Sequence, residues 1–145
     1  MAIEFENIII ESVILAVIIF GAVYLELWYY RRYQKIEDEK TKKMILRLIK
    51  EDLTRKQRFL EESIKFKDYK PFFTNVWDSI ILSGKQTLLS FELINNFEHS
   101  YSWMRYYNTE LHQRGVVGNE QTLLELLGEI KKTIESSQSM FKSLN

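Results

Sequence analysis

The chain has 145 residues with no cysteine, one proline and five glycines. The lack of cysteine excludes disulfides, thiolate metal ligands and a cysteine nucleophile, and so few turn-forming residues argue against an all-β fold. The formal net charge is zero because −4 over residues 1–30 and −2 over residues 71–145 cancel fourteen bases against eight acids in residues 31–70.

The N-terminal segment is apolar enough to span a membrane. Residues 8–30 read IIIESVILAVIIFGAVYLELWYY, and only Glu11 and Glu26 among these 23 residues are ionisable. At ~1.5 Å rise per residue, a helix of this length crosses the roughly 30 Å hydrocarbon core of a bilayer. We therefore predict a transmembrane helix over residues 8–30, with the lipid bilayer as its partner.

The flanks of this segment predict its orientation. Six aromatic or basic residues suit the headgroup interface at its end: Trp28, Tyr29, Tyr30, Arg31, Arg32 and Lys35. By the positive-inside rule this end is cytoplasmic, so residues 1–7 form a short acidic external tail of a single-pass cell-membrane protein. A cleaved signal peptide and a buried core helix are the alternatives. A signal peptide needs a basic start and a small-residue cleavage site, whereas this start is acidic and the apolar run ends in bulky rings.

Glu11 and Glu26 lie fifteen residues apart, which places them within about 60° of each other on a helix. One interpretation is that each reaches toward water at its own end of the span. The alternative is a polar stripe that faces partner helices, since ionisable groups inside membranes usually face protein. Ser12 and Ala16, with Gly21, add a small-residue signal for helix dimerisation.

Residues 31–70 predict a basic juxtamembrane helical neck that continues the anchor, because they contain no glycine and the first proline is Pro71. Apolar residues spaced by three and four form a seam: Leu46, Ile49, Leu53 and Leu60. Lys56 and Ser63 interrupt this seam. A second stripe widens the apolar face: Ile45, Leu48, Phe59 and Ile64. The wide face favours packing on later helices of the chain over a self-associating coiled coil.

The bases nearest the anchor predict contact with anionic lipid headgroups. They are Arg31, Arg32, Lys35, Lys40, Lys42 and Lys43. Acids at positions 37–39 lie among them and would repel phosphate, so nucleic acid is not an expected partner.

Residues 71–145 predict a cytoplasmic helical domain. The residue before a proline leaves the α region, so Lys70 ends the neck. Thr74 or Asn75 caps a short helix that stops at Gly84, where a left-handed C-cap is expected. Ser90 caps the next helix, which runs to Gly115. Its buried stripe is Leu93, Phe97, Tyr101, Met104 and Asn108.

Residues 115–118 turn the chain, and Asn119 caps a last helix that runs to about Leu144. The residues expected to face inward are Leu123, Leu124, Leu127, Ile130, Ile134 and Phe141. Short loops between helices imply antiparallel neighbours. The predicted fold class is therefore all-α, with an N-terminal transmembrane helix continuing into a small cytoplasmic antiparallel helical bundle.

A set of short motifs follows the predicted anchor and charged helix along this chain. They are Pro71-Phe-Phe-Thr-x-x-Trp77, Ser83-Gly84, Leu88-Leu89, Tyr101 and Asn108, placed after an anchor and a charged helix. In this order the chain resembles uncharacterised prokaryotic single-pass membrane proteins over roughly residues 1–114. The resemblance implies architecture only and carries no activity.

The densest polar and aromatic group is the candidate ligand site. It comprises His99, Trp103, Arg105, Tyr106 and Tyr107. An aromatic face with an arginine can stack a base and hold a nucleotide-like ligand. The alternative is that these rings belong to the core and its rim, with Trp103 and Tyr107 packing on Phe72, Phe73 or Trp77. No catalytic, metal or cofactor motif is found, so neither enzyme activity nor a cofactor is expected.

Three functional hypotheses follow. The first is a membrane-tethered interaction or scaffold protein that oligomerises through anchor and neck or docks a membrane or cytoplasmic protein. The second is a signalling effector or sensor whose cytoplasmic domain binds a small nucleotide-like ligand. The third is an accessory subunit of a larger membrane complex, with Glu11 and Glu26 facing partner helices.

Overall fold

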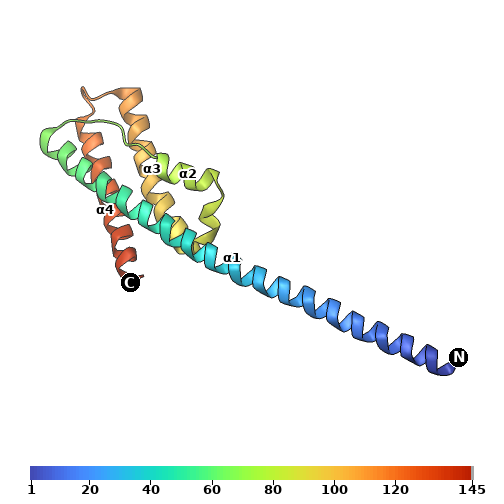
Figure 1. The fold of residues 1–145 in the computed structure, drawn as a ribbon. Helices are drawn as coiled ribbons and strands as arrows, with labels where there is room; N and C mark the ends of the chain where they lie inside the picture. The colour runs from blue at the N-terminus through green and yellow to red at the C-terminus, as the bar shows by residue number, and fades with distance from the viewer. Residues whose placement is uncertain (145) are drawn as a thin grey trace. The chain divides into compact units, whose positions relative to one another are not determined.

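The computed structural model describes residues 1–144, and over that range it contains helices and no strand. The elements are α1 (Ala2–Phe66), α2 (Asn75–Leu82), the 3-10 helix η1 (Lys85–Leu88), α3 (Phe91–Arg114) and α4 (Glu120–Ser143) (Figure 1). The expected all-α chain is confirmed. The chain divides into two compact units, Met1–Lys40 and Thr41–Asn145. The described part of the second unit, residues 41–144, is called the helical module below.

The first unit is a stretch of α1 whose apolar side chains are all exposed. Every residue from Met1 to Tyr30 is exposed, including Leu15 at 60%, Val17 at 66% and Phe20 at 75%. One helix of the described chain is thus long and apolar enough to cross a membrane by length and composition. The absence of glycine and proline breaks between residues 22 and 66 lets this helix continue through the neck.

Helix α1 ends at Phe66, four residues before the predicted end at Lys70. Lys67 adopts a left-handed conformation with φ of 52°, and the Asp68 amide donates to the Ser63 carbonyl oxygen at 3.3 Å. A left-handed residue followed by a hydrogen bond back over five residues is the Schellman motif that commonly ends a helix. The proline at 71 therefore lies in an already extended segment, and the prediction placed the end too late.

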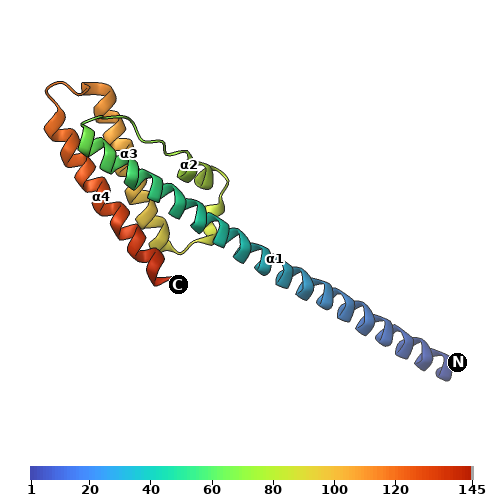
Figure 2. The ribbon, with the colours of Figure 1, turned by 60° about the vertical axis from the view of Figure 1, so that its left-hand side comes forward.

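In the helical module, α3 and α4 lie side by side and run in opposite directions (Figures 1 and 2). Residues 115–119 join them, with Gly115 and Gly118 at φ of 67° and 75°, which only glycine adopts readily. The second half of α1 runs in the same direction as α3. This follows because residues 67–90, which include α2 and η1, carry the chain back along the module before α3 begins.

The core of the module contains side chains from all four α-helices, whereas η1 has no buried residue. Its largest fully buried side chains include Ile45, Ile49, Leu53, Leu60, Trp77, Phe97, Tyr101, Met104, Tyr107, Leu123, Leu127 and Ile130. The predicted stripe of α3 is buried from Leu93 to Met104, while Asn108 is half-buried. In α1 the second predicted stripe is wrong in part, because Leu48 is 42% and Ile64 38% exposed.

The helix ends show which sequence signals act locally. The Ser90 side chain accepts from the Leu93 amide at 3.4 Å, and Gly84 is left-handed with φ of 72°, as predicted. Thr74 and Asn119 occupy the predicted N-cap positions of α2 and α4, but neither caps the helix with its side chain. The Asn119 side-chain nitrogen Nδ2 donates instead to the Gly115 carbonyl oxygen at 3.3 Å.

Candidate functional site

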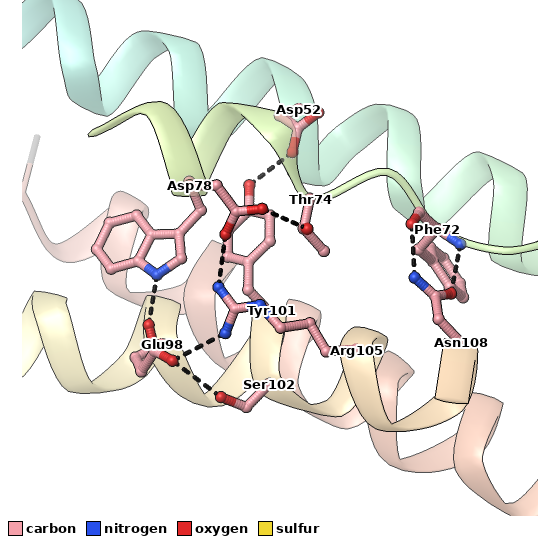
Figure 3. Close-up of polar contacts among 10 residues, drawn as sticks. Asp52, Phe72, Thr74, Asp78, Glu98, Tyr101, Ser102, Arg105 and Asn108 are labelled. Atoms are coloured by element: carbon pink, nitrogen blue, oxygen red, sulfur yellow. Dashed lines mark hydrogen bonds and ion pairs between the residues drawn. The ribbon is translucent and has the colours of Figure 1, made fainter. Parts of the chain in front are cut away.

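The densest polar group of the module centres on Arg105 of α3 (Figure 3). Its Nη2 donates to Asp78 Oδ1 of α2 at 2.7 Å, and its Nη1 donates to Glu98 Oε1, two turns earlier on α3, at 3.0 Å. The three side chains are 40–47% exposed, so water screens this network. One guanidinium thus serves two carboxylates and joins α2 to α3.

Further donors converge on the same two carboxylates. Glu98 accepts from the Trp77 indole nitrogen at 2.6 Å and from the Ser102 hydroxyl at 3.0 Å. Burial raises the pKa of Glu98, but the hydrogen bonds from Trp77, Arg105 and Ser102 outweigh it and hold the pKa below its ordinary value. Both donors and charge therefore keep Glu98 ionised at neutral pH.

Asp78 is held in the same way. Its Oδ2 accepts from the Thr74 hydroxyl at 2.7 Å. Burial raises the pKa of Asp78, while the hydrogen bonds from Thr74 and Arg105 lower it by more. With two ionised carboxylates and one guanidinium, the network carries a net charge of about −1, which repels a phosphate. Both hydrogen-bonding ends of the Arg105 guanidinium are thus occupied by carboxylates, whereas the sequence predicted Arg105 as part of a face that binds a nucleotide-like ligand.

A second polar group lies inside the module, between α1 and α3 (Figure 3). The Tyr101 hydroxyl donates to Asp52 Oδ2 at 2.6 Å, and Lys56 Nζ donates to Asp52 Oδ1 at 3.0 Å. Tyr101 is fully buried, Asp52 is 3% exposed and the Lys56 side chain 13%. Burial raises the pKa of Tyr101, and the Asp52 carboxylate raises it further, so the phenol stays protonated and donates.

Asn108 fixes the extended segment that precedes α2 (Figure 3). Its Oδ1 accepts from the Phe72 amide and its Nδ2 donates to the Phe72 carbonyl oxygen, both at 2.7 Å. The Phe72 ring packs edge-on against Tyr107 of α3, with ring centroids 5.3 Å apart. The Asn108 side chain thus satisfies both the N–H and the C=O of Phe72, as the main chain of a neighbouring strand would. This pair of hydrogen bonds ties the segment 67–74 to α3.

The five residues of the predicted ligand face lie in three environments. His99, Trp103 and Tyr106 form an edge-to-face ladder along α3, with the Trp103 indole donating to His99 Nε2 at 3.3 Å. Arg105 belongs to the carboxylate network described above. Tyr107 is fully buried, and burial raises its pKa to about 12. Only His99, Trp103 and Tyr106 therefore share an accessible surface.

A depression of about 580 Å³ adjoins the Trp103 and Tyr106 rings of this ladder, between α3 and α4. Trp103 and Tyr106 line one side, and α4 contributes the other. The lining residues of α4 are Thr122, Glu125, Leu126, Gly128, Glu129 and Lys132. Two glutamates against one lysine give this depression a negative balance, which disfavours a phosphate-bearing ligand.

The residues predicted to lie at the headgroup interface, from Trp28 to Lys35, are on the first unit and are exposed, whereas the predicted lipid-contacting Lys42 and Lys43 belong to the second unit and Lys42 is half-buried. Trp28 packs edge-on against Tyr29 at 5.2 Å, and the Arg32 guanidinium lies 5.4 Å from the Trp28 ring centroid. The remaining members of this set, exposed on the same helix, are Tyr30, Arg31 and Lys35. Glu11 and Glu26 are exposed on the same continuous helix, so the 60° separation expected from their spacing applies.

The polar groups that sequence reasoning missed had a readable signal. Asp52 follows Ile49 by three residues and Lys56 follows Asp52 by four, so a charged pair lies on the buried side of α1. Such a pair needs a third partner, since buried charges are paired and hydrogen-bonded. Within residues 1–144, no group of three or more His, Asp or Glu side chains is placed to hold a metal ion.

Comparison with known protein families, curated proteins and solved structures finds no match. The resemblance to prokaryotic single-pass membrane proteins therefore stays a prediction from the sequence.

Proposed function

We propose that this chain is a membrane-tethered helical scaffold. Residues 8–30 cross the cell membrane once with the N-terminus outside, and the module is a cytoplasmic bundle that assembles with further copies or with a protein partner. The observation that carries the proposal is that every residue of the apolar segment 8–30 is exposed. Burying a large aliphatic or aromatic side chain stabilises a protein by about 1.5–3 kcal/mol, and fourteen such side chains in residues 8–27 are exposed, so burying them in a bilayer would contribute on the order of 20 kcal/mol.

The module supports this proposal because its core is complete without the anchor. All of its buried apolar residues fall between Ile45 and Phe141. The anchor is thus left free to lie in lipid or against other transmembrane helices. The polar groups of the module bind one another: Arg105 donates to Asp78 and Glu98, and Tyr101 donates to Asp52. That use favours a structural role over the nucleotide-binding alternative.

Topology tests the anchor directly, since a chain without cysteine accepts single labels cleanly. Glu4→Cys and Val117→Cys each place one thiol at an exposed position, the first in the tail and the second in the module. A membrane-impermeant maleimide should label Glu4→Cys in intact cells and Val117→Cys only after permeabilisation. Labelling of Val117→Cys in intact cells would overturn the orientation.

Assembly tests the scaffold role. The mass of the full chain in mild detergent, measured by light scattering, should be that of a defined oligomer or of a complex with a co-purifying protein. A strictly monomeric chain with no partner would contradict the proposal.

An accessory subunit of a larger membrane complex is the second candidate, favoured by a carboxylate within an apolar exposed helix. Glu11→Leu with Glu26→Leu should then abolish co-purification of partner helices, because intramembrane carboxylates bind protein rather than lipid. Glu4→Leu, in the acidic tail, is the matched control. If assembly survives the double substitution, the glutamates are interfacial and this role is excluded.

A further inference from the structure

Two of the most exposed large apolar side chains of the module flank one turn of the chain. Leu82, the last residue of α2, is 88% exposed, and Phe91, the first residue of α3, is 77% exposed. Between them lie the turn at Gly84 and η1. Figures 1 and 2 both place η1 at the end of the module where α3 begins and α4 ends, and Lys43, two residues into the module, lines a hollow with Phe141 and Leu144 at that end of α4. The name "proximal end" is used for this end of the module.

The proximal end also gathers positive charge from three elements. Lys43 of α1, Lys85 of η1 and Lys142 of α4 are exposed there. The exposed acids nearest to these lysines in the chain are Glu92 of α3 and, on the turn of α1 before Lys43, Asp38 and Glu39. Large apolar side chains among lysines are typical of surfaces that lie in the headgroup layer of an anionic bilayer.

A hollow of about 410 Å³ opens at the same end between α1 and α4. Its apolar lining is Leu46, Phe141 and Leu144, and its basic lining is Lys43, Arg47 and Lys50. Arg47 also pairs with Glu51 at 3.0 Å, whereas Lys43 and Lys50 have no carboxylate partner among residues 1–144. An apolar floor under a basic rim matches an amphiphile with an anionic head.

We propose that the proximal end is a second lipid contact, which docks on the anionic cytoplasmic face of the bilayer that holds the anchor. Leu82 and Phe91 enter the boundary between headgroups and acyl chains, and the lysines pair with the headgroups. This inference rests on the proposed membrane anchorage. Docking would fix how the module presents its other surfaces, including the Trp103 ladder, to a partner.

The short chain between anchor and module supports the bilayer as the surface on which the proximal end docks. Residues 31–40 connect the anchor to the module, and ten helical residues at ~1.5 Å each extend about 15 Å. The headgroup layer occupies roughly 5–8 Å of that distance on each side of the hydrocarbon core. A connection this short keeps the proximal end within about 10 Å of the headgroup layer even along the bilayer normal, and a tilted connection brings it into contact, so the effective concentration of lipid is high.

Environment-sensitive labels at single cysteines test the docking in the full chain, reconstituted in nanodiscs with or without phosphatidylserine. Leu82→Cys carries the label at the proximal end, Val117→Cys is the control at the opposite end, where the side chain is 97% exposed, and Val17→Cys reports on the anchor. We expect a blue-shifted emission at position 82 with phosphatidylserine, an aqueous emission at 117, and a hydrocarbon emission at 17. Replacing Lys43, Lys85 and Lys142 by Gln should abolish the shift at position 82.

Three outcomes would overturn parts of this account separately. An aqueous signal at 82 with a hydrocarbon signal at 17 refutes docking and leaves the anchor intact. Aqueous signals at both positions refute the anchor itself. A shift at 82 that ignores phosphatidylserine and grows with protein concentration identifies a protein contact and refutes the lipid. Circular dichroism of each variant checks that the helices remain.

Discussion

The buried hydrogen bond between Tyr101 and Asp52 gives the sharpest stability prediction. Tyr101→Phe removes one oxygen atom from a fully buried ring and leaves the packing volume nearly unchanged. The Asp52 carboxylate, 3% exposed, then keeps Lys56 as its partner and loses a 2.6 Å hydrogen bond. Hydrogen bonds to charged groups contribute about 1.5–3 kcal/mol, and a buried acceptor without its donor keeps its desolvation cost.

We therefore expect Tyr101→Phe to lower the free energy of unfolding by about 2 kcal/mol. For a domain near 100 residues this corresponds to a Tm lower by roughly 10 °C. Near-UV circular dichroism of the full chain in detergent, during urea and thermal unfolding, measures the change in the module. Tyr106→Phe is the matched control, because Tyr106 is 51% exposed on the same helix.

A double substitution separates the free energy of the Tyr101–Asp52 hydrogen bond from the general cost of changing a core side chain. With Asp52→Asn already present, Tyr101→Phe should cost clearly less than it does in the native chain, because the charged acceptor is gone. A loss below about 0.5 kcal/mol for the single Tyr101→Phe change, or equal losses for Tyr101→Phe and Tyr106→Phe, would refute the reasoning, since surface changes fall in that range.

Three further changes have defined outcomes, each measurable by urea unfolding. The pKa values of Asp78 and Glu98 are lowered by folding, so the stability they contribute is present above their unfolded pKa and is lost as pH falls through the folded pKa. Arg105→Gln should flatten that acid dependence below about pH 4.5; an unchanged profile would contradict the network. Asn108→Ala should lower the free energy of unfolding by about 1–3 kcal/mol, because it leaves the Phe72 N–H and C=O without their partner. A loss near zero would contradict a stabilising role for these two hydrogen bonds. Gly128→Ala should stabilise the module by up to about 1 kcal/mol, because nothing lies within 4 Å of an added Cβ in the middle of α4, and destabilisation would argue against open space there.

The helices and several of their ends could be predicted because their signals are local. Ser90 and Gly84 act through their own backbone neighbourhood, so a serine or glycine at the right spacing is sufficient. The end of α1 was placed too late because Lys67, a residue without a turn preference, takes the left-handed position four residues before the proline. Local preference for this conformation cannot be read from a lysine.

The polar ties were missed because their partners come from distant parts of the chain. Asp52 meets a tyrosine 49 residues away, and Arg105 meets Asp78 across 27 residues. Helical periodicity predicts which residues share a side but not which side faces another helix. Tyr106 and Tyr107 illustrate this, since adjacent tyrosines of equal propensity lie at 51% and 0% exposure.

The central claim is that residues 8–30 lie in a bilayer. It is tested most directly by carbonate extraction of cell membranes that contain the full chain or its Ile14→Arg/Ile18→Arg variant. Each arginine at the centre of a span costs about 2.5–3.5 kcal/mol of insertion free energy, so the pair should prevent insertion. Met44→Arg, at an exposed apolar position of the module, is the control and should leave extraction unchanged. We predict that the native chain stays in the membrane pellet and that the double-arginine variant is released. Release of the native chain, or retention of the variant, would contradict the account.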